Sequence, residues 1–290
     1  MNYIVIPAYQ PDNKLIKLIE KIHEKSDFHI LVIDDGSSSK CKDIFDKAEQ
    51  YATVLRHQVN QGKGQALKTA FDYIQQQNSY GTVVTADADG QHKIWDILRT
   101  ANKASENPNK LILGVRAFTG KVPLRSRFGN SLTKALFKIQ TGVEVADTQT
   151  GLRAFTTNLI PFMLKIEGNR YEYEMNMLLE ATKEYQILEV PIETVYINDN
   201  EGSHFRPIRD GLMIYKNIFK FALSSLSSFV VDYIVYALAI LILPTVPTSL
   251  RIFLANGVAR VTSSIFNYST NKKLVFKNDD SLVKTGMGYF

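Results

Sequence analysis

The stretch Val83-Val84-Thr85-Ala86-Asp87-Ala88-Asp89-Gly90-Gln91 decides the fold, because a short apolar run ends directly in two carboxylates and an amide. The run over residues 82–86 predicts a buried strand. Residues two apart on an extended backbone point to the same side, so Asp87 and Asp89 are expected to converge on one hard cation. Their oxygens, with that of Gln91, suit Mg²⁺ or Mn²⁺. The alternative is a solvated acidic turn.

Apolar runs alternate with helical patterns along most of the chain. Strands are predicted at residues 3–7, 29–34, 53–56, 82–86 and 110–115, and helices at 12–25, 38–50, 63–77, 93–107, 127–141 and 171–185. This alternation is typical of βαβ units and predicts an α/β fold with a mainly parallel sheet. Ligands bind such sheets at the carboxyl ends of the strands, so the residues that follow each strand are the candidates for a site.

The composition excludes several classes of protein. The chain has 290 residues, of which 45% are hydrophobic and 22% charged, and this excludes disorder and low complexity. Its single cysteine, Cys41, excludes a disulfide scaffold and a cysteine-based metal cluster. The net charge of +5 is too small to indicate a nucleic-acid partner. The first residues do not resemble a signal peptide.

Two further motifs stand at the ends of predicted strands or the start of a helix. Asp34-Asp35-Gly36-Ser37 places carboxylates where they can accept hydrogen bonds from ribose hydroxyls or a base N–H. Asn60-Gln61-Gly62-Lys63-Gly64 opens a helix, where the helix N-terminus and the Lys63 charge favour a phosphate. This second motif is neither a G-x-G-x-x-G fingerprint nor a P-loop. Taken singly, each motif is also compatible with an ordinary turn.

Basic and acidic residues follow the fifth predicted strand. The basic group is either a phosphate clamp or a solvated face. Asp147, in Asp147-Thr148-Gln149-Thr150-Gly151, is a candidate catalytic or orienting carboxylate, and it is also compatible with an ordinary loop position. Acidic residues also begin the helix predicted at 171–185. The basic residues are Arg116, Lys121, Arg125, Arg127 and Arg206, and the acidic residues at the helix start are Glu172 and Glu174.

The last quarter of the chain has the pattern of a membrane segment. Residues 221–243 carry one charge, Asp232, and would form a helix of about 34 Å, long enough to cross a bilayer core. A second run at 252–268 completes a helical hairpin, and the lysines flanking both runs place their side in the cytoplasm. Residues 206–220 predict an amphipathic helix in the membrane interface. The alternative for the hairpin is a buried helix pair in a soluble domain, and the alternative for residues 206–220 is an ordinary surface helix.

Together these motifs, in one order and with Pro7-Ala8-Tyr9 before them, resemble a family 2 glycosyltransferase with the GT-A fold, of the dolichyl-phosphate mannose synthase and bactoprenol glucosyltransferase type. The resemblance covers about residues 1–220. Residues 221–290 resemble the first half of a GtrA-like membrane domain, through Phe229-Val230-Val231-Asp232 and residues 267–276. The expected organisation is a GT-A domain over 1–205, an interfacial helix over 206–220 and an incomplete two-span membrane segment over 221–290.

The resemblance also implies roles for individual residues, although Gln10 departs from the asparagine of many relatives. The implied nucleotide-binding residues are Pro7, Ala8, Tyr9, Asp34, Asp35, Lys63, Asp87 and Ala88. The implied ligands of Mg²⁺ or Mn²⁺ are Asp87, Asp89 and Gln91, and the implied catalytic residues are Asp89, Asp147 and Arg116. The candidates for binding an acceptor phosphate are Arg116, Arg125, Arg127, Ser131 and Arg206.

The reaction implied is inverting transfer of a sugar from a UDP- or GDP-linked donor to a polyprenyl phosphate. It would serve cell-envelope synthesis, in a multi-pass protein of the cell membrane with a cytoplasmic catalytic domain. The expected partners are the nucleotide sugar, the lipid and the membrane, with no nucleic acid; a homo-oligomer is left open. The alternatives are a membrane-tethered nucleotide-sugar-binding subunit without turnover and a sugar nucleotidyltransferase. The latter needs a Gly-rich loop where this chain has Pro7-Ala8-Tyr9-Gln10-Pro11.

Overall fold

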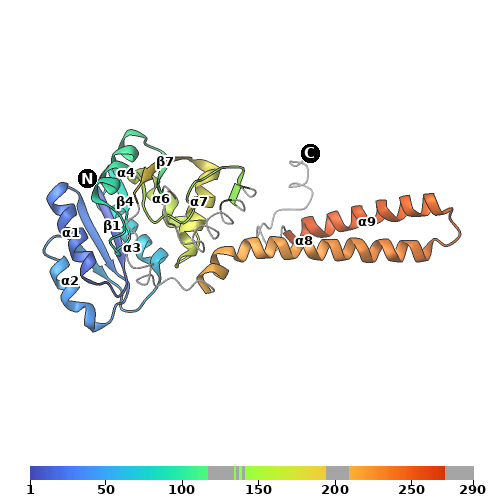
Figure 1. Ribbon diagram of the computed structural model, residues 1–290, viewed down its shortest axis with the longest axis horizontal. Helices are drawn as coiled ribbons and strands as arrows, with labels where there is room; N and C mark the ends of the chain where they lie inside the picture. The colour runs from blue at the N-terminus through green and yellow to red at the C-terminus, as the bar shows by residue number, and fades with distance from the viewer. Residues whose placement is uncertain (117–133, 135–136, 139–140, 194–208, 272–290) are drawn as a thin grey trace. The chain divides into compact units, whose positions relative to one another are not determined.

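The computed structural model describes residues 1–116, 134, 137–138, 141–193 and 209–271 (Figure 1). The chain divides into two compact units, which we call the N-terminal unit (Met1–Asp210) and the C-terminal unit (Gly211–Phe290). In the N-terminal unit the strands are β1 (Tyr3–Ala8), β2 (His29–Asp34), β3 (Thr53–Arg56), β4 (Thr82–Thr85), β5 (Lys110–Arg116), β6 (Arg153–Thr156) and β7 (Gln186–Ile192). The α-helices are α1 (Asn13–Lys25), α2 (Lys42–Ala48), α3 (Lys63–Gln76), α4 (Ile94–Glu106), α6 (Ile160–Lys165) and α7 (Glu172–Glu184), and short 3₁₀ turns lie at Ser39–Cys41 and Thr157–Leu159.

The strands form one sheet in the order β3-β2-β1-β4-β6-β5-β7. β1 pairs in parallel with β2 and β4, β2 with β3, and β5 with β7, whereas β6 runs antiparallel to β4 and β5. The mainly parallel α/β sheet predicted from the sequence is therefore confirmed. The sequence patterns missed β6, α6 and β7, and the helix predicted over 127–141 lies largely outside the described residues.

Helices cover both faces of the sheet, because the central strands are apolar on both sides. Ile4 and Ile6 of β1 belong to a buried cluster with Leu15 and Ile19 of α1. On the opposite face, α3 packs against β1 and β2, and its Phe71 meets Phe155 of β6 edge to face, with ring centroids 5.4 Å apart. This two-sided packing fixes the strand ends from which the site is built.

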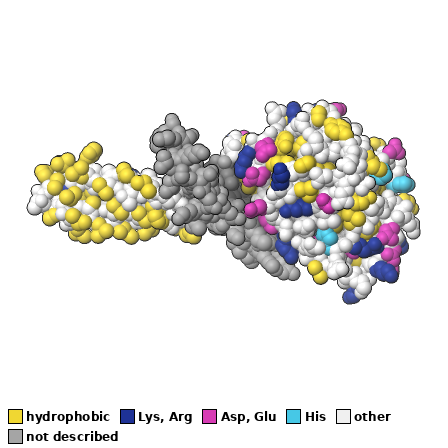
Figure 2. Space-filling view, turned by 180° about the vertical axis from the view of Figure 1, so that it is seen from behind, with side chains coloured by type: hydrophobic (Ala, Val, Ile, Leu, Met, Phe, Trp, Pro, Cys, Tyr) yellow, Lys and Arg dark blue, Asp and Glu magenta, His cyan; other side chains and the backbone are white. Residues whose placement is uncertain are grey.

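The C-terminal unit contains two helices joined by a short turn, α8 (Arg209–Ile242, which begins just before the unit boundary) and α9 (Thr248–Thr270). Within the described residues, one helical stretch is long and apolar enough to cross a membrane, Leu223–Ile242, with a mean hydropathy of 2.0. Only 6% of this stretch is buried, and hydrophobic side chains cover much of the visible face of the helical hairpin (Figure 2). The second predicted span lies within α9, and its crossing of a membrane stays a prediction.

Polar side chains join α8 to α9. Ser263 donates a hydrogen bond of 2.9 Å to Asp232 Oδ1, and Arg260 Nη1 lies 3.7 Å from Asp232 Oδ2. Asp232 and Arg260, two charged groups that would be costly in lipid, thus lie close to each other. α8 also runs without a break from residue 209 into the apolar stretch, so residues 209–220 of the predicted interfacial helix are continuous with the first predicted span.

Candidate active site

The carboxyl ends of β1, β2 and β4 lie next to one another, as the parallel pairing requires. Ala8 at the end of β1 pairs with Asp34 at the end of β2, and Val5 pairs with Thr85, where β4 ends. The backbone N–H of Asp35 donates to the Ala8 carbonyl over 2.9 Å. The predicted nucleotide-binding segments, residues 7–9, 34–35 and 87–88, lie at the ends of these three strands or directly after them, and they therefore share one edge of the sheet.

Asp35 holds the loop that precedes α3. Its carboxylate accepts hydrogen bonds from the Asn60 side-chain amide (2.9 Å) and from the backbone N–H groups of Gln61 (2.9 Å) and Gly62 (2.8 Å). His57 Nδ1 lies 2.8 Å from Asp35 Oδ1, and the Asp35 side chain is 4% exposed. A carboxylate has about four acceptor positions, and here they are used by the protein. The nucleotide contact predicted for Asp35 stays a prediction, and loop holding is the role its contacts support.

Lys63 is the first residue of α3 and forms two ion pairs. Its Nζ lies 2.7 Å from Asp87 Oδ1 and 2.9 Å from Glu174 Oε2. Burial by itself would lower the pKa of Lys63, but the charges of Asp87 and Glu174 outweigh it and raise the pKa above its usual value. The ammonium is therefore kept charged at the place where the sequence predicted a phosphate contact.

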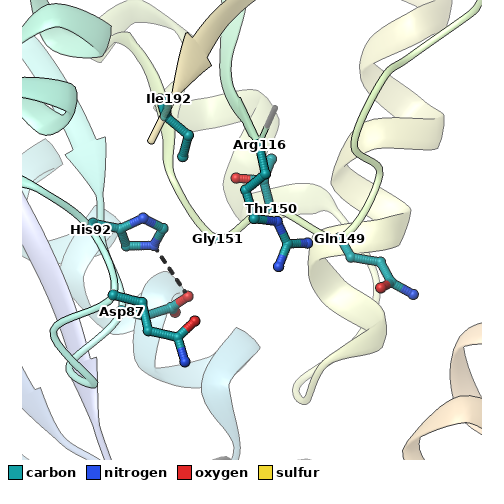
Figure 3. Close-up of a pocket in the computed structure, with 8 residues that line it drawn as sticks. Asp87, His92, Arg116, Gln149, Thr150, Gly151 and Ile192 are labelled. Carbon is teal, nitrogen blue, oxygen red and sulfur yellow. Dashed lines mark ion pairs between the residues drawn. The ribbon is translucent and has the colours of Figure 1, made fainter. Parts of the chain in front are cut away.

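Asp87 is surrounded by groups that favour its ionised form. Burial would raise its pKa, yet Lys63 and, more weakly, His92 lower it well below the usual range. His92 Nε2 lies 3.5 Å from Asp87 Oδ2, as Figure 3 shows. On the other side a methyl group added to Gly151 would lie 2.4 Å from Asp87 Oδ2. The backbone at residue 151 thus packs directly on this carboxylate.

Asp89 lies in a turn and not on the strand. β4 ends at Thr85, and residues 88 and 89 form a turn, so the extended-backbone argument for Asp87 and Asp89 is wrong in its geometry. The two carboxylates are nevertheless neighbours electrostatically. Burial and then the charge of Asp87 raise the pKa of Asp89, while a hydrogen bond of 3.0 Å from the Gln91 N–H to Asp89 Oδ1 opposes the shift.

These residues fit a divalent cation by their chemistry. The charge of Asp87 disfavours ionisation of Asp89, and a cation bound between the two carboxylates would offset this repulsion. The Gln91 side-chain amide, two residues after Asp89, offers a further oxygen ligand. Among the described residues, no group of three or more His, Cys, Asp or Glu side chains could hold a metal ion. A cation at Asp87, Asp89 and Gln91 would thus take its remaining ligands from substrate oxygens and water, as Mg²⁺ commonly does.

Arg116 and Asp147 form a second, separate ion pair. Arg116 ends β5, and its Nε and Nη2 lie 2.5 and 3.0 Å from the two carboxylate oxygens of Asp147. The Asp147 side chain is fully buried, whereas Arg116 is 26% exposed. The Gln149 N–H also donates to Asp147 Oδ1 over 3.1 Å. Of the two roles predicted for Asp147, these contacts support orientation of Arg116.

Asp87 and Arg116, one residue from each of these charged clusters, line a common pocket, with Asp87 and His92 on one side and Arg116 and Gln149 on the other (Figure 3). Sequence reasoning missed His92, although it follows Gln91 directly, and assigned no role to Glu174. Four predicted acceptor residues lie outside the described residues, so their positions stay predictions: Arg125, Arg127, Ser131 and Arg206. The lining residues are Asp87, Gln91, His92, Arg116, Gln149, Thr150, Gly151 and Ile192.

The sheet order and the acidic turn after β4 define a GT-A-type α/β domain. The family model described as "Glycosyl transferase family 2" matches residues 3–162, and the chain therefore belongs to the family 2 glycosyltransferases. A second model, "GtrA/DPMS, transmembrane domain", matches residues 220–290. The family resemblance read from the sequence motifs is thus confirmed, and with it the assignment as a glycosyltransferase.

Two relatives of this chain have names that state transfer of a sugar to dolichyl phosphate. A UDP-N-acetylglucosamine–dolichyl-phosphate N-acetylglucosaminyltransferase of Methanococcus voltae is 26% identical over 215 residues, 67% of this chain and 85% of that protein. A dolichyl-phosphate beta-glucosyltransferase of Saccharomyces cerevisiae is 26% identical over 252 residues, 74% of this chain and 72% of that protein.

Among solved structures, glucosyl-3-phosphoglycerate synthase from Mycobacterium tuberculosis, in complex with Mn²⁺, UDP and phosphoglyceric acid, superposes with a TM-score of 0.57. The match covers 76% of each chain at 17% sequence identity. At that identity the likeness supports the fold alone.

Proposed function

We propose that this chain transfers a sugar from a UDP- or GDP-linked donor to a polyprenyl phosphate, with inversion, at the cytoplasmic face of the cell membrane. The observation that carries the proposal is the pocket that sets the Asp87 carboxylate opposite the Arg116 guanidinium. One side suits a cation-bound diphosphate, and the other suits a second phosphate. The dolichyl-phosphate transferases among its relatives and the match to the GtrA/DPMS domain support a lipid phosphate as acceptor.

The donor diphosphate is assigned to the Asp87 side of the pocket. A divalent cation, Mg²⁺ or Mn²⁺, held by Asp87, Asp89 and Gln91 would neutralise charge on the departing diphosphate. Lys63 supplies a second positive charge from the N-terminus of α3, where helix geometry also favours anions. Residues 7–9 and 34–35, at the neighbouring strand ends, are the candidates to bind the nucleoside.

The acceptor phosphate is assigned to Arg116. A guanidinium can bind a phosphate through two parallel hydrogen bonds, and Asp147 fixes its orientation from the buried side. A lipid phosphate oxygen is already ionised near pH 7, so the attack needs no strong general base. Catalysis is then chiefly positioning and charge stabilisation. Arg125, Arg127, Ser131 and Arg206 stay candidates for the same phosphate.

The C-terminal unit is assigned to the membrane. The apolar stretch Leu223–Ile242 and the GtrA/DPMS match support anchoring beside the lipid acceptor. We propose two spans, with the flanking lysines on the cytoplasmic side. A full-length chain recovered without detergent from the soluble fraction would contradict this placement.

The decisive experiment uses the full chain in detergent with a short polyprenyl phosphate and a panel of UDP- and GDP-sugars, with Mn²⁺ or Mg²⁺. The expected result is a glycosylated lipid phosphate from one donor, with nucleoside diphosphate released only when the lipid is present. Asp72→Asn, an exposed change on α3, serves as the active control. Donor binding without turnover for any lipid would instead favour a binding subunit.

A further inference from the structure

The Lys63 ammonium bridges carboxylates from two separate segments of the N-terminal unit. Asp87 follows β4, and Glu174 lies in the first turn of α7. The Lys63 side chain is 18% exposed and that of Glu174 13%, so this part of the network is largely shielded from water. The proposed function uses Lys63 and Asp87 and leaves Glu174 without a role.

The frame around this bridge is held by other contacts. The buried guanidinium of Arg153 donates to the backbone carbonyl of Glu174 and, over 3.0 Å, to that of Thr150. The Gln65 N–H donates to the Asn169 carbonyl over 2.9 Å, which ties α3 to the loop before α7. A methyl group on Gly64 would meet the Tyr173 side chain at 2.5 Å, so the two segments touch. These contacts hold α3 and α7 together without using the Glu174 carboxylate.

Lys63 forms an ion pair with Asp87, the carboxylate that a divalent cation would also bind. A dication at Asp87 repels the ammonium, and an ammonium left in a shielded site without a carboxylate is strongly disfavoured. Glu174 is the second carboxylate already in contact, 2.9 Å away. If the ion pair with Asp87 breaks, the ion pair with Glu174 can thus keep the Lys63 ammonium charged and in the same position.

We propose that Glu174 is a positioning residue: it retains the Lys63 ammonium when a divalent cation takes Asp87, and so keeps Lys63 beside the donor diphosphate. This inference rests on the proposed function, because it needs a cation at Asp87. Without the Glu174 charge, Asp87 is the one carboxylate of the two that remains for Lys63, so the Lys63 ammonium competes with the cation for Asp87. Removing Lys63 removes that competition.

The test is Mn²⁺ binding to the full chain in detergent, without nucleotide, followed by electron paramagnetic resonance of free Mn²⁺. Glu174→Gln should weaken Mn²⁺ binding about tenfold, the scale of one charge-assisted interaction. Lys63→Met should bind Mn²⁺ at least as tightly as the wild type, and the double variant should match Lys63→Met. Glu180→Gln, on an exposed part of the same helix, is the matched control and should bind like the wild type.

Two results would overturn the inference. One is wild-type Mn²⁺ affinity in Glu174→Gln, and the other is an equal loss caused by Glu174→Gln in the Lys63→Met background, which would mean that the charge acts directly on the cation. If Glu174→Gln does not fold, Glu174→Asp replaces it and must show a smaller weakening in the same direction. Sugar transfer by the wild type is measured alongside, so that failure of this inference is separable from failure of the proposed function.

Discussion

Gly151 lies against the carboxylate of Asp87: a Cβ at position 151 would stand 2.4 Å from Oδ2 and 2.8 Å from Oδ1. The Gly151 carbonyl also accepts a hydrogen bond of 2.8 Å from the Thr85 hydroxyl, at the end of β4. Because this hydrogen bond ties the Gly151 backbone to the end of β4, we expect an added methyl group to displace the Asp87 side chain from Lys63 before it displaces the backbone.

Gly151→Ala should therefore lower sugar transfer by about a hundredfold, the scale of a small misplacement at a reacting centre. Steady-state rates at saturating lipid and donor, measured over a Mn²⁺ series, check this. Gly257→Ala is the control, because a Cβ there meets nothing within 4 Å. Unchanged turnover in Gly151→Ala would show that the position of Asp87 is not critical.

Asp87→Asn and Asp89→Asn should have opposite effects on stability in a metal-free buffer near pH 7. The pKa of Asp87 is lowered in the fold, so its ionised form stabilises the protein above the unfolded pKa, and this contribution is lost as pH falls. The pKa of Asp89 is raised, so its contribution is present at low pH and is lost as pH rises through the folded pKa.

Near pH 7 we thus expect Asp87→Asn to lower the free energy of unfolding and Asp89→Asn to raise it, each by an amount on the order of 1 kcal/mol, with the midpoint of thermal unfolding moving in the same direction. Both variants should lose transfer activity. Thermal unfolding with a chelator, at pH 7 and again at pH 5, measures the contrast. Destabilisation by both substitutions would mean that the fold does not disfavour the ionised form of Asp89.

Asp35→Asn should destabilise the N-terminal unit by roughly 2 kcal/mol. The substitution turns an acceptor into a donor opposite the backbone N–H groups of Gln61 and Gly62, which leaves buried donors unpaired. A fall of about 4–8 °C in the unfolding midpoint is the corresponding signal. The exposed Asp72→Asn on α3 should stay near the wild-type value. A wild-type midpoint in Asp35→Asn would rule out the loop-holding role.

Arg116→Lys should impair use of the acceptor more than use of the donor. A lysine offers a point charge in place of the fork that now pairs with both oxygens of buried Asp147. We expect kcat/KM for the lipid phosphate to fall about 10- to 100-fold, as for loss of a charged contact in a transition state, with donor KM within about twofold. Arg56→Lys, in an exposed ion pair, is the control. Equal losses for donor and acceptor would place Arg116 elsewhere in the mechanism.

The local part of the structure could be predicted from the sequence. The strands at residues 29–34 and 53–56 have the predicted limits, and the helix that begins at Lys63 begins where the glycines and Lys63 indicated. These features depend on apolar runs and on turn residues, which act over a few positions. The motifs at the strand ends could be identified from the sequence because they too are local patterns.

The pairing of β6 was not predictable in that way. Arg153–Thr156 is a short strand inserted antiparallel between β4 and β5, and its ladder joins residues far apart in the chain. The turn at Asp89 was also not predicted, since the sequence pattern indicated an extended backbone through Asp87 and Asp89, whereas β4 ends at Thr85, two residues before Asp87.

By itself the sequence determined which residue types meet at the carboxyl edge of the sheet, because short apolar runs and the turns that follow them are local properties. Only the tertiary structure decided how those side chains are used: Lys63 between Asp87 and Glu174, Arg116 on Asp147, and Asp35 on the loop before α3. Each of these contacts joins separate segments. Burial then makes pairing of opposite charges necessary, because an unpaired charge away from water is strongly disfavoured.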